Sequence, residues 1–395
     1  MLHNEQHQLT HKLLHDKMTK LYLFQAFLTF VKSLVGIFAP VYLYSLGFSF
    51  EKIIIFIIGI SLTYLIFIPH SIKIINKIGF KYIILLSVPI YLFHIATLNY
   101  IELNSFMIYL SSFSYGLHMA IFWPAMHLEI STNANKKKTS SDLGTLQILI
   151  TIFGGIAPLI GGTFLELLTF FQLLIFSFII ILIGIIPLLL SEDIKLKNYN
   201  FKYKDYNRLN NNSRLEKTKK PFFAEGIESF LNVSFWPIIL FTLVNNNFII
   251  LGLLYTIISI LSIFLIVYLK KYLDKNNKNS TMIKSAKSIS LIWILRITAV
   301  FFAGFFIYIV EMMAKLVYST YNLTFQSIFY SNAKKNSAMD YIIFREVYLH
   351  GAKILFGIFA LLIIISFGAE KLILTSFFLI GIVNTIWLSR LREEI

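Results

Sequence analysis

Long apolar segments alternate with short polar ones along the whole chain. Each apolar segment is close to the roughly 20 residues that a helix needs to cross the hydrocarbon core of a bilayer. The ninth and tenth segments are separated only by a turn that begins at Gly304. The pattern predicts twelve transmembrane helices, over residues 20–44, 51–69, 82–100, 105–129, 143–165, 170–190, 220–243, 248–269, 285–303, 307–330, 346–366 and 371–389.

The composition agrees with a membrane protein. Hydrophobic residues make up 57% of the chain and charged residues only 14%, whereas soluble domains carry about 25% charged residues. This excludes a soluble enzyme and a disordered protein. The chain has no Cys, which removes disulfides, thiolate catalysis and thiolate metal sites. A membrane β-barrel would show alternating segments of about ten residues. We therefore expect an all-α membrane protein.

The net charge is +15, and the basic residues are unevenly distributed along the chain. Nearly all Lys and Arg residues fall in the polar segments on the side of both termini, and such segments usually face the cytosol. We expect a multi-pass protein of the cell membrane with cytosolic termini and no signal peptide. The positive charge indicates topology and contact with anionic membrane lipids, so nucleic acid is not an expected partner. We expect a monomer.

A polar segment rich in Asn, Lys and Tyr divides the chain into two halves. We expect a cytosolic segment over 1–19, a six-helix bundle over 20–190, a cytosolic linker with at most a short surface helix over 191–219, and a second bundle over 220–395. An offset of about 197 residues places Pro40 on Pro237 and Asn76-Lys77 near Asp274-Lys275. Two like-oriented bundles imply a pseudo-two-fold axis along the membrane normal, with a site between them near the midplane.

At this point the sequence resembles the major facilitator superfamily. The segment Asn76-Lys77-Ile78-Gly79-Phe80-Lys81 is similar to the family's G-x-x-x-D-R-x-G-R-R/K loop, with Asn in place of the acid. The second copy keeps the acid as Asp274-Lys275, and Asn277 stands where Gly is usual, since Asn tolerates a left-handed conformation. The resemblance implies conformational gating loops at Asn76, Lys77, Gly79, Asp274 and Lys275.

Two further features follow from that resemblance. Arg345 and Glu346, at the predicted start of the eleventh helix, are expected to lock against the loop between helices 2 and 3. By symmetry, Asp274 should face the start of the fifth helix, where Ser140 or Ser141 could cap. The fifth helix looks like the family's G-x-x-x-G-P-x-x-G-G segment, which is associated with antiporters, through Gly154, Pro158, Gly161 and Gly162.

Enzyme signatures are absent from the sequence. It contains no G-x-x-x-x-G-K-[ST], no H-E-x-x-H and no paired acidic motif, so we expect neither an enzyme nor a cofactor. His3, His7, His11 and His15 recur every four residues. On a helix they would form one stripe, which fits either a metal ion or the polar face of a surface helix. No metal site is assigned.

Charged residues inside spans are costly and usually face the interior of the bundle. Lys32 lies near the middle of the first helix, with snorkelling as its alternative. Arg296 should pair with Glu311, either as a structural pair or at a solute site. Lys315 lies four residues after Glu311, so a pair within one helix is its alternative. Glu225 and Glu228 are either coupling residues or interfacial charges.

Other polar and aromatic residues are candidates for solute binding or coupling, with packing as the alternative interpretation. They are His118, Trp123, Trp236, Asn322 and Gln326. Because Lys32, Lys315 and Lys353 outnumber the deep acids, an anionic or neutral polar solute is favoured over a cation. We expect a secondary active transporter that works by alternating access, with proton coupling left open. The alternatives are a lipid or amphiphile flippase on the same fold and a transport-inactive scaffold or receptor.

Overall fold

The structure, a computed structural model, describes residues 17–35, 38–133, 139–191, 199, 201–302 and 304–393, and all regular structure in these ranges is helical. The N half contains α2 (Lys17–Val35), α3 (Phe38–Ser45), α4 (Phe50–Ile78), α5 (Phe80–Asn99), α6 (Met107–Asn133), α7 (Thr139–Leu167) and α8 (Phe170–Leu189). The linker holds α9 (Asp205–Asn210) and the 3₁₀ turn η1 (Glu216–Thr218).

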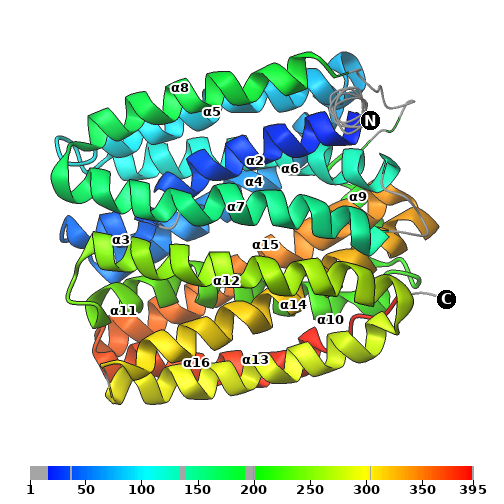
Figure 1. Ribbon diagram of the computed structural model, residues 1–395. Helices are drawn as coiled ribbons and strands as arrows, with labels where there is room; N and C mark the ends of the chain where they lie inside the picture. The colour runs from blue at the N-terminus through cyan, green and yellow to red at the C-terminus, as the bar shows by residue number, and fades with distance from the viewer. Residues whose placement is uncertain are drawn as a thin grey trace, which may run out of the picture.

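The C half repeats this order of helices. It contains α10 (Lys219–Phe230), the π-helical segment η2 (Leu231–Phe235), α11 (Trp236–Leu243), α12 (Phe248–Lys275), α13 (Lys278–Phe301), α14 (Phe306–Lys335), α15 (Ala338–Phe367) and α16 (Lys371–Leu388). The two bundles lie one above the other in Figure 1, and α2 begins and α16 ends on its right-hand side. We call this end of the molecule, where α9 also lies, the linker face.

The helices are long enough to account for twelve membrane crossings. Nine helical stretches of the described chain could cross a membrane by length and composition. The other three, α6, α13 and α14, are 27, 24 and 30 residues long but more polar. At the linker face the helices run past the predicted spans, so that α15 begins at Ala338 rather than residue 346. Hydropathy marks only the part of a helix that lies in hydrocarbon, and polar ends remain helical in water.

The predicted repeat pairs α3 with α11, in the first membrane-crossing segment of each half. α3 and α11 each have eight residues, and α11 directly follows the π-helical segment η2. Pro40 is the third residue of α3, and Pro237 is the second residue of α11. The superposition of Pro40 on Pro237 remains a prediction.

Among the long helices α4–α8 and α12–α16, interior prolines occur only in the first set. α4 to α8 contain Pro69, Pro89, Pro124, Pro158 and Pro187, one in each helix. The helices from α12 to α16, all within the described ranges, contain none. A proline has no backbone N–H, so each one leaves the carbonyl four residues earlier without its usual helical partner.

The two halves touch most closely where α7 packs on α12. A β-carbon on Gly162 would lie 2.4 Å from the backbone oxygen of Phe248, and one on Gly252 would lie 2.3 Å from that of Pro158. On its other side α7 approaches α2, because a β-carbon on Gly161 would lie 2.4 Å from the oxygen of Leu34. The glycine motif of the fifth helix thus lets α7 pack tightly on both neighbours.

The predicted gating loops are mostly helical. Asn76 and Lys77 lie in the last turn of α4, and Gly79 alone turns the chain into α5 with φ of 87°. Such a φ favours glycine. Asn277 has φ of −70°, and its side chain accepts a hydrogen bond from the Ser280 N–H. The expectation of a left-handed Asn277 is therefore wrong, since this residue caps the start of α13.

Candidate functional site

Two cavities lie on either side of the π-helical segment η2. The first, about 220 Å³, lies between the halves and is lined by α3, α4, α5 and α6 of one and by η2 and α15 of the other. The second, about 180 Å³, is lined mainly by helices of the C half, with Gln147 of α7. Asn232 lines the second cavity, whereas Val233 and Ser234 line the first. π-Helical turns often occur at functional sites because they reorient successive side chains.

The first cavity, called the aromatic cavity below, has an aromatic wall in the N half. The wall consists of Tyr91, His94, Tyr115 and Trp123. His350 and Lys353 of α15 line it from the C half. The described residues place no carboxylate within salt-bridge distance of the Lys353 ammonium group. The cavity therefore combines ring surfaces with one available cation.

Lys32 lies against this wall rather than in the cavity lining. Its Nζ is 4.4 Å from the ring centroid of Phe122, 5.3 Å from that of Trp123 and 5.6 Å from that of Tyr91. Among the described residues no carboxylate is close enough to form an ion pair with it. The aromatic faces supply the cation–π attraction that holds this charge inside the bundle.

The second cavity, called the polar cavity below, contains the predicted Arg296–Glu311 pair. Arg296 Nε lies 2.9 Å from Glu311 Oε1, and a second guanidinium nitrogen lies 3.2 Å from Oε2. The remaining nitrogen donates to Asn232 Oδ1 at 2.7 Å. Both charged side chains are only 3% exposed. The predicted contact is confirmed, and its bidentate geometry is the strongest that Arg forms with a carboxylate.

Both carboxylate oxygens of Glu311 accept hydrogen bonds from Arg296. Lys315 is therefore left without the partner that was predicted in its own helix. No ion pair joins Glu311 to Lys315, although both are described and both line the polar cavity. Trp236 also lines this cavity, and its indole N–H is buried with no hydrogen-bond acceptor among the described residues. Asn322 completes this side. The polar cavity thus offers an ammonium group and an indole N–H as donors.

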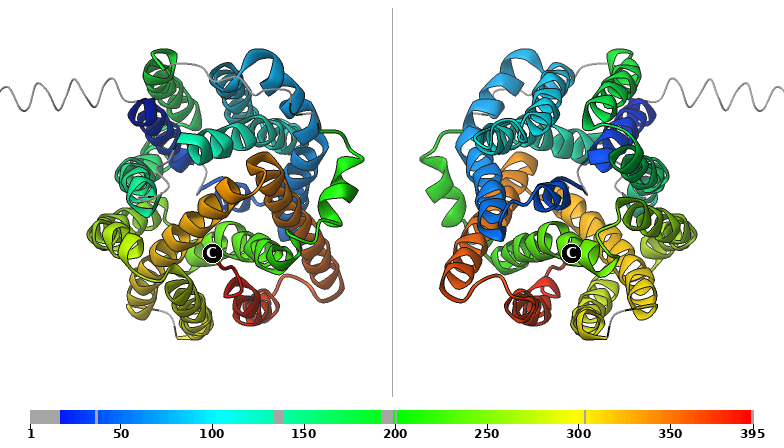
Figure 2. Two further views of the ribbon diagram at one scale, coloured as in Figure 1. Left: turned by 90° about the vertical axis from the view of Figure 1, so that its right-hand side faces the viewer. Right: turned by 90° about the vertical axis from the view of Figure 1, so that its left-hand side faces the viewer.

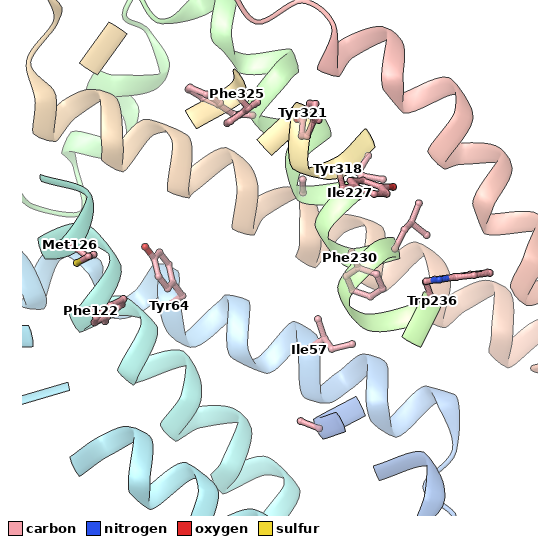
Figure 3. Packing of buried hydrophobic residues seen from close by; sticks show 14 of the residues in the cluster. Ile57, Tyr64, Phe122, Met126, Ile227, Phe230, Trp236, Tyr318, Tyr321 and Phe325 are labelled. Atoms are coloured by element: carbon pink, nitrogen blue, oxygen red, sulfur yellow. The ribbon is translucent and has the colours of Figure 1, made fainter. Parts of the chain in front are cut away.

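The buried aromatic residues around η2 come from both halves. Figure 3 shows Ile57 and Tyr64 on α4, Phe122 on α6, and Trp236 and Tyr318 on the C-half side. The Tyr318 hydroxyl donates to Glu228, which also accepts from the Trp293 indole N–H at 3.1 Å. Glu228 is therefore held by neutral donors deep in the C half and does not reach either cavity lining.

Arg345 and Glu346 join the halves, but not through the predicted partner. Arg345 binds Glu225 and Glu346, and it donates to His127 Nε2 on α6 at 3.2 Å. The expected lock against the turn between α4 and α5 is wrong. α15 begins eight residues earlier than predicted, so Arg345 lies two turns inside the helix. There it contacts His127 between the aromatic cavity and the linker face.

Asp274 makes the predicted contact at the start of the fifth helix. Its two carboxylate oxygens accept hydrogen bonds from the backbone N–H groups of Ser140 and Ser141, at 3.0 and 2.9 Å. This satisfies otherwise unpaired N–H groups of α7 from the opposite half. Its repeat counterpart, Asn76, donates instead to the backbone oxygen of Tyr199 in the linker. Lys77 and Lys275 are exposed at the ends of their helices.

Two of the candidates predicted from the sequence line neither cavity. His118 is fully buried behind the aromatic wall, where its Nδ1–H donates to the Ser87 carbonyl at 2.8 Å. Gln326 lines neither cavity. The His3, His7, His11 and His15 stripe lies outside the described residues, and within those residues no group of three His, Asp or Glu side chains could hold a metal.

Several lining residues were not predicted from the sequence. Gln147, Asn232 and Tyr255 line the polar cavity, and His127 links the halves. The sequence feature that could have identified them is a polar side chain in the middle of an apolar span. That signal marks interior residues but does not say which cavity they face.

No protein-family model matches the sequence, and no curated protein matches it either. Solved structures do match. The human organic anion transporter MFSD10 (TETRAN) superposes with a TM-score of 0.66 at 10% identity, over 94% of this chain and 98% of that chain. The nucleoside transporter NupG superposes with a TM-score of 0.66 at 15% identity, over 95% of this chain and 97% of that chain. The chain has the fold of the major facilitator superfamily, as its sequence predicts.

Proposed function

We propose that this protein is a secondary active transporter that moves a small organic solute across the cell membrane by alternating access. The bundles 20–190 and 220–395 would rock against each other around the aromatic and polar cavities. The fold supports this proposal, since transporters built from two such repeats bind solute at the interface between them. We further propose that the linker face is cytosolic, because most of the Lys and Arg residues lie there.

The solute class is proposed from the charges that line the cavities. Lys353 in the aromatic cavity and Lys315 in the polar cavity have no described carboxylate within salt-bridge distance. The nearby acids are already bound: Glu311 by Arg296, and both Glu225 and Glu346 by Arg345. A charge is felt strongly where the dielectric constant is low. The cavities therefore favour a small organic anion or a neutral polar solute and disfavour a cation.

The aromatic wall adds a second requirement on the solute. Rings of Tyr91, Tyr115 and Trp123 present flat apolar surface, while Lys353 supplies one charge at the other side. A solute with an apolar or planar body and a single carboxylate would use both. The two structures that superpose on this chain, an organic anion transporter and a nucleoside transporter, are named for an anionic and a neutral polar solute. This agrees with the proposed class.

Lys353 in the aromatic cavity is the observation that carries the proposal, and it sets the test. The purified protein would be heated with small carboxylates, with neutral amides of the same shape and with amines. We expect carboxylates to raise the melting temperature, and Lys353→Ala to abolish that rise without changing the melting temperature of the free protein much. Lys271→Ala is the matched control, because Lys271 is exposed on α12 and its loss changes the net charge equally.

Flux measurements separate the proposed function from its alternatives. Proteoliposomes containing the protein should take up a stabilising carboxylate, and the Lys353→Ala protein should not. Movement of fluorescent lipid between leaflets, without carboxylate uptake, would instead indicate a flippase. Protein that binds and moves none of these compounds would indicate a scaffold or receptor, and stabilisation by amines alone would contradict the proposed charge preference.

A further inference from the structure

The described part of the linker lies on the outside of the bundle and touches both halves. Figure 2 shows the bright green segment that contains α9 beside the helices of both halves rather than extended into solvent. Phe201 and Leu209 are buried, at 0% and 2% exposure. Such burial is unexpected for a segment whose composition suggests a solvated connection.

Two tyrosines of this segment bind the N half. The Tyr206 hydroxyl donates to the Leu65 carbonyl at 2.8 Å, and the Tyr203 hydroxyl donates to the Ile66 carbonyl at 2.9 Å. Both carbonyls belong to the interior of α4. Leu65 lies four residues before Pro69, which has no N–H to offer. The linker therefore satisfies a carbonyl that the proline leaves unpaired.

The same segment binds the C half through α15. The Tyr199 hydroxyl donates to Asp340, and Arg208 binds both oxygens of that carboxylate at 3.0 and 3.3 Å. The Tyr348 hydroxyl of α15 donates to Asn210 at 2.6 Å. Partial burial and the hydrogen bond to Asp340 raise the pKa of the Tyr199 phenol, so it remains a donor at neutral pH.

α4 and α15 belong to different halves and pack against each other. Opening of the linker face in alternating access would separate them, and the stretch from Tyr199 to Asn210 could not keep both sets of contacts. We propose that Tyr199 and residues 201–210 form a clasp that stabilises the state in which the linker face is closed. The clasp regulates access to the aromatic cavity, and it rests on the proposed function only in requiring that this face opens.

The absence of Cys allows a direct test with a single reporter thiol. Ser61 lines the aromatic cavity on α4 and is 1% exposed, so Ser61→Cys reports water access to that cavity. Membrane-impermeant maleimide would be applied to membrane vesicles from the linker side and, separately, from the opposite side. The test protein carries Tyr199→Phe, Tyr203→Phe and Tyr206→Phe, which remove three hydroxyls but keep the rings.

We expect labelling from the linker side to rise about tenfold in this variant, because each lost hydrogen bond contributes modestly to the closed state. Labelling from the opposite side should not rise. The matched control is Tyr268→Phe with Tyr272→Phe, two exposed tyrosines on α12, which should leave both rates unchanged. Equal labelling in test and control proteins, or an equal rise from both sides, would overturn the clasp.

A second variant tests the clasp independently, in case the triple variant does not fold. Asp340→Asn removes the charge that Arg208 and Tyr199 share, and it should also raise labelling from the linker side alone. If the triple variant does not accumulate, the outcome with Asp340→Asn decides. If no protein labels from either side, the cavity never opens, which contradicts both the proposed transport cycle and the clasp, whereas linker-side labelling that is equal in test and control proteins contradicts the clasp alone.

Discussion

The Arg296–Glu311 pair gives the sharpest quantitative expectation. Both side chains are 3% exposed and form two hydrogen bonds with each other. Replacing one member of a buried pair leaves the other charge uncompensated, at a cost of roughly 3–5 kcal/mol. In Glu311→Gln the amide oxygen can still accept one hydrogen bond, and Asn232 still binds the guanidinium group.

Aromatic rings around Arg296 further reduce the loss of stability in Glu311→Gln. The Arg296 guanidinium carbon lies 4.5 Å from the Trp236 ring and 4.9 Å from the Trp293 ring, and such contacts contribute about 0.5–2 kcal/mol each. We therefore expect Glu311→Gln to lower the free energy of unfolding by about 3 kcal/mol, at the lower end of the range for a broken buried pair. Arg296→Met should cost at least as much, because Glu311 would keep no cation within salt-bridge distance.

A double-mutant cycle tests this reasoning. Unfolding would be followed in mixed micelles for both single variants and for Glu311→Gln with Arg296→Met. Because the double variant contains no buried unpaired charge, it should be more stable than either single variant. The Lys278–Glu393 pair, at 13% and 28% side-chain exposure, is the control and should contribute at most about 1 kcal/mol. Additive losses in the double variant would refute the argument.

Three further changes have defined outcomes. Gly252→Ala should destabilise the protein by about 1–3 kcal/mol in an unfolding assay, because the new β-carbon would lie 2.3 Å from the Pro158 oxygen. Gly351→Ala is the control and should not destabilise the protein, because its β-carbon would meet nothing within 4 Å. Asp274→Asn should cost about 1 kcal/mol and speed amide exchange at the start of α7, since one of two capping oxygens becomes an amide nitrogen; unchanged exchange would contradict the cap. Lys32→Ala should weaken carboxylate binding severalfold in the melting assay while Lys271→Ala does not, and equal binding in both would restrict Lys32 to packing.

The sequence predicted those contacts that a charged residue needs when it lies in an apolar span or at a helix end. Arg296 in an apolar span required a carboxylate, and Glu311 was the nearest. Asp274 followed from the repeat. The partner of Arg345 was missed because hydropathy ends where the bilayer ends and α15 does not. The Tyr206 contact could not be predicted from the sequence for another reason. Pro69 predicts an unpaired carbonyl, but nothing in the polar linker sequence indicates which linker residue binds it.

The difference in interior prolines between α4–α8 and α12–α16 has a consequence for how the protein fits bilayers of different thickness. A helix bends most easily where a proline removes its internal hydrogen bond, while an unbroken helix adapts to a thicker or thinner bilayer mainly by tilting as a whole. In bilayers of shorter or longer acyl chains, α4–α8 would therefore deform internally, whereas α12–α16 would tilt. Amide exchange measured across such a lipid series should change near Pro69, Pro89 and Pro124 while staying constant in the middle of α12 and α16. Equal responses in the two sets of helices would show that the prolines do not set this difference, whereas the expected pattern would make acyl-chain length a selective means of deforming α4–α8.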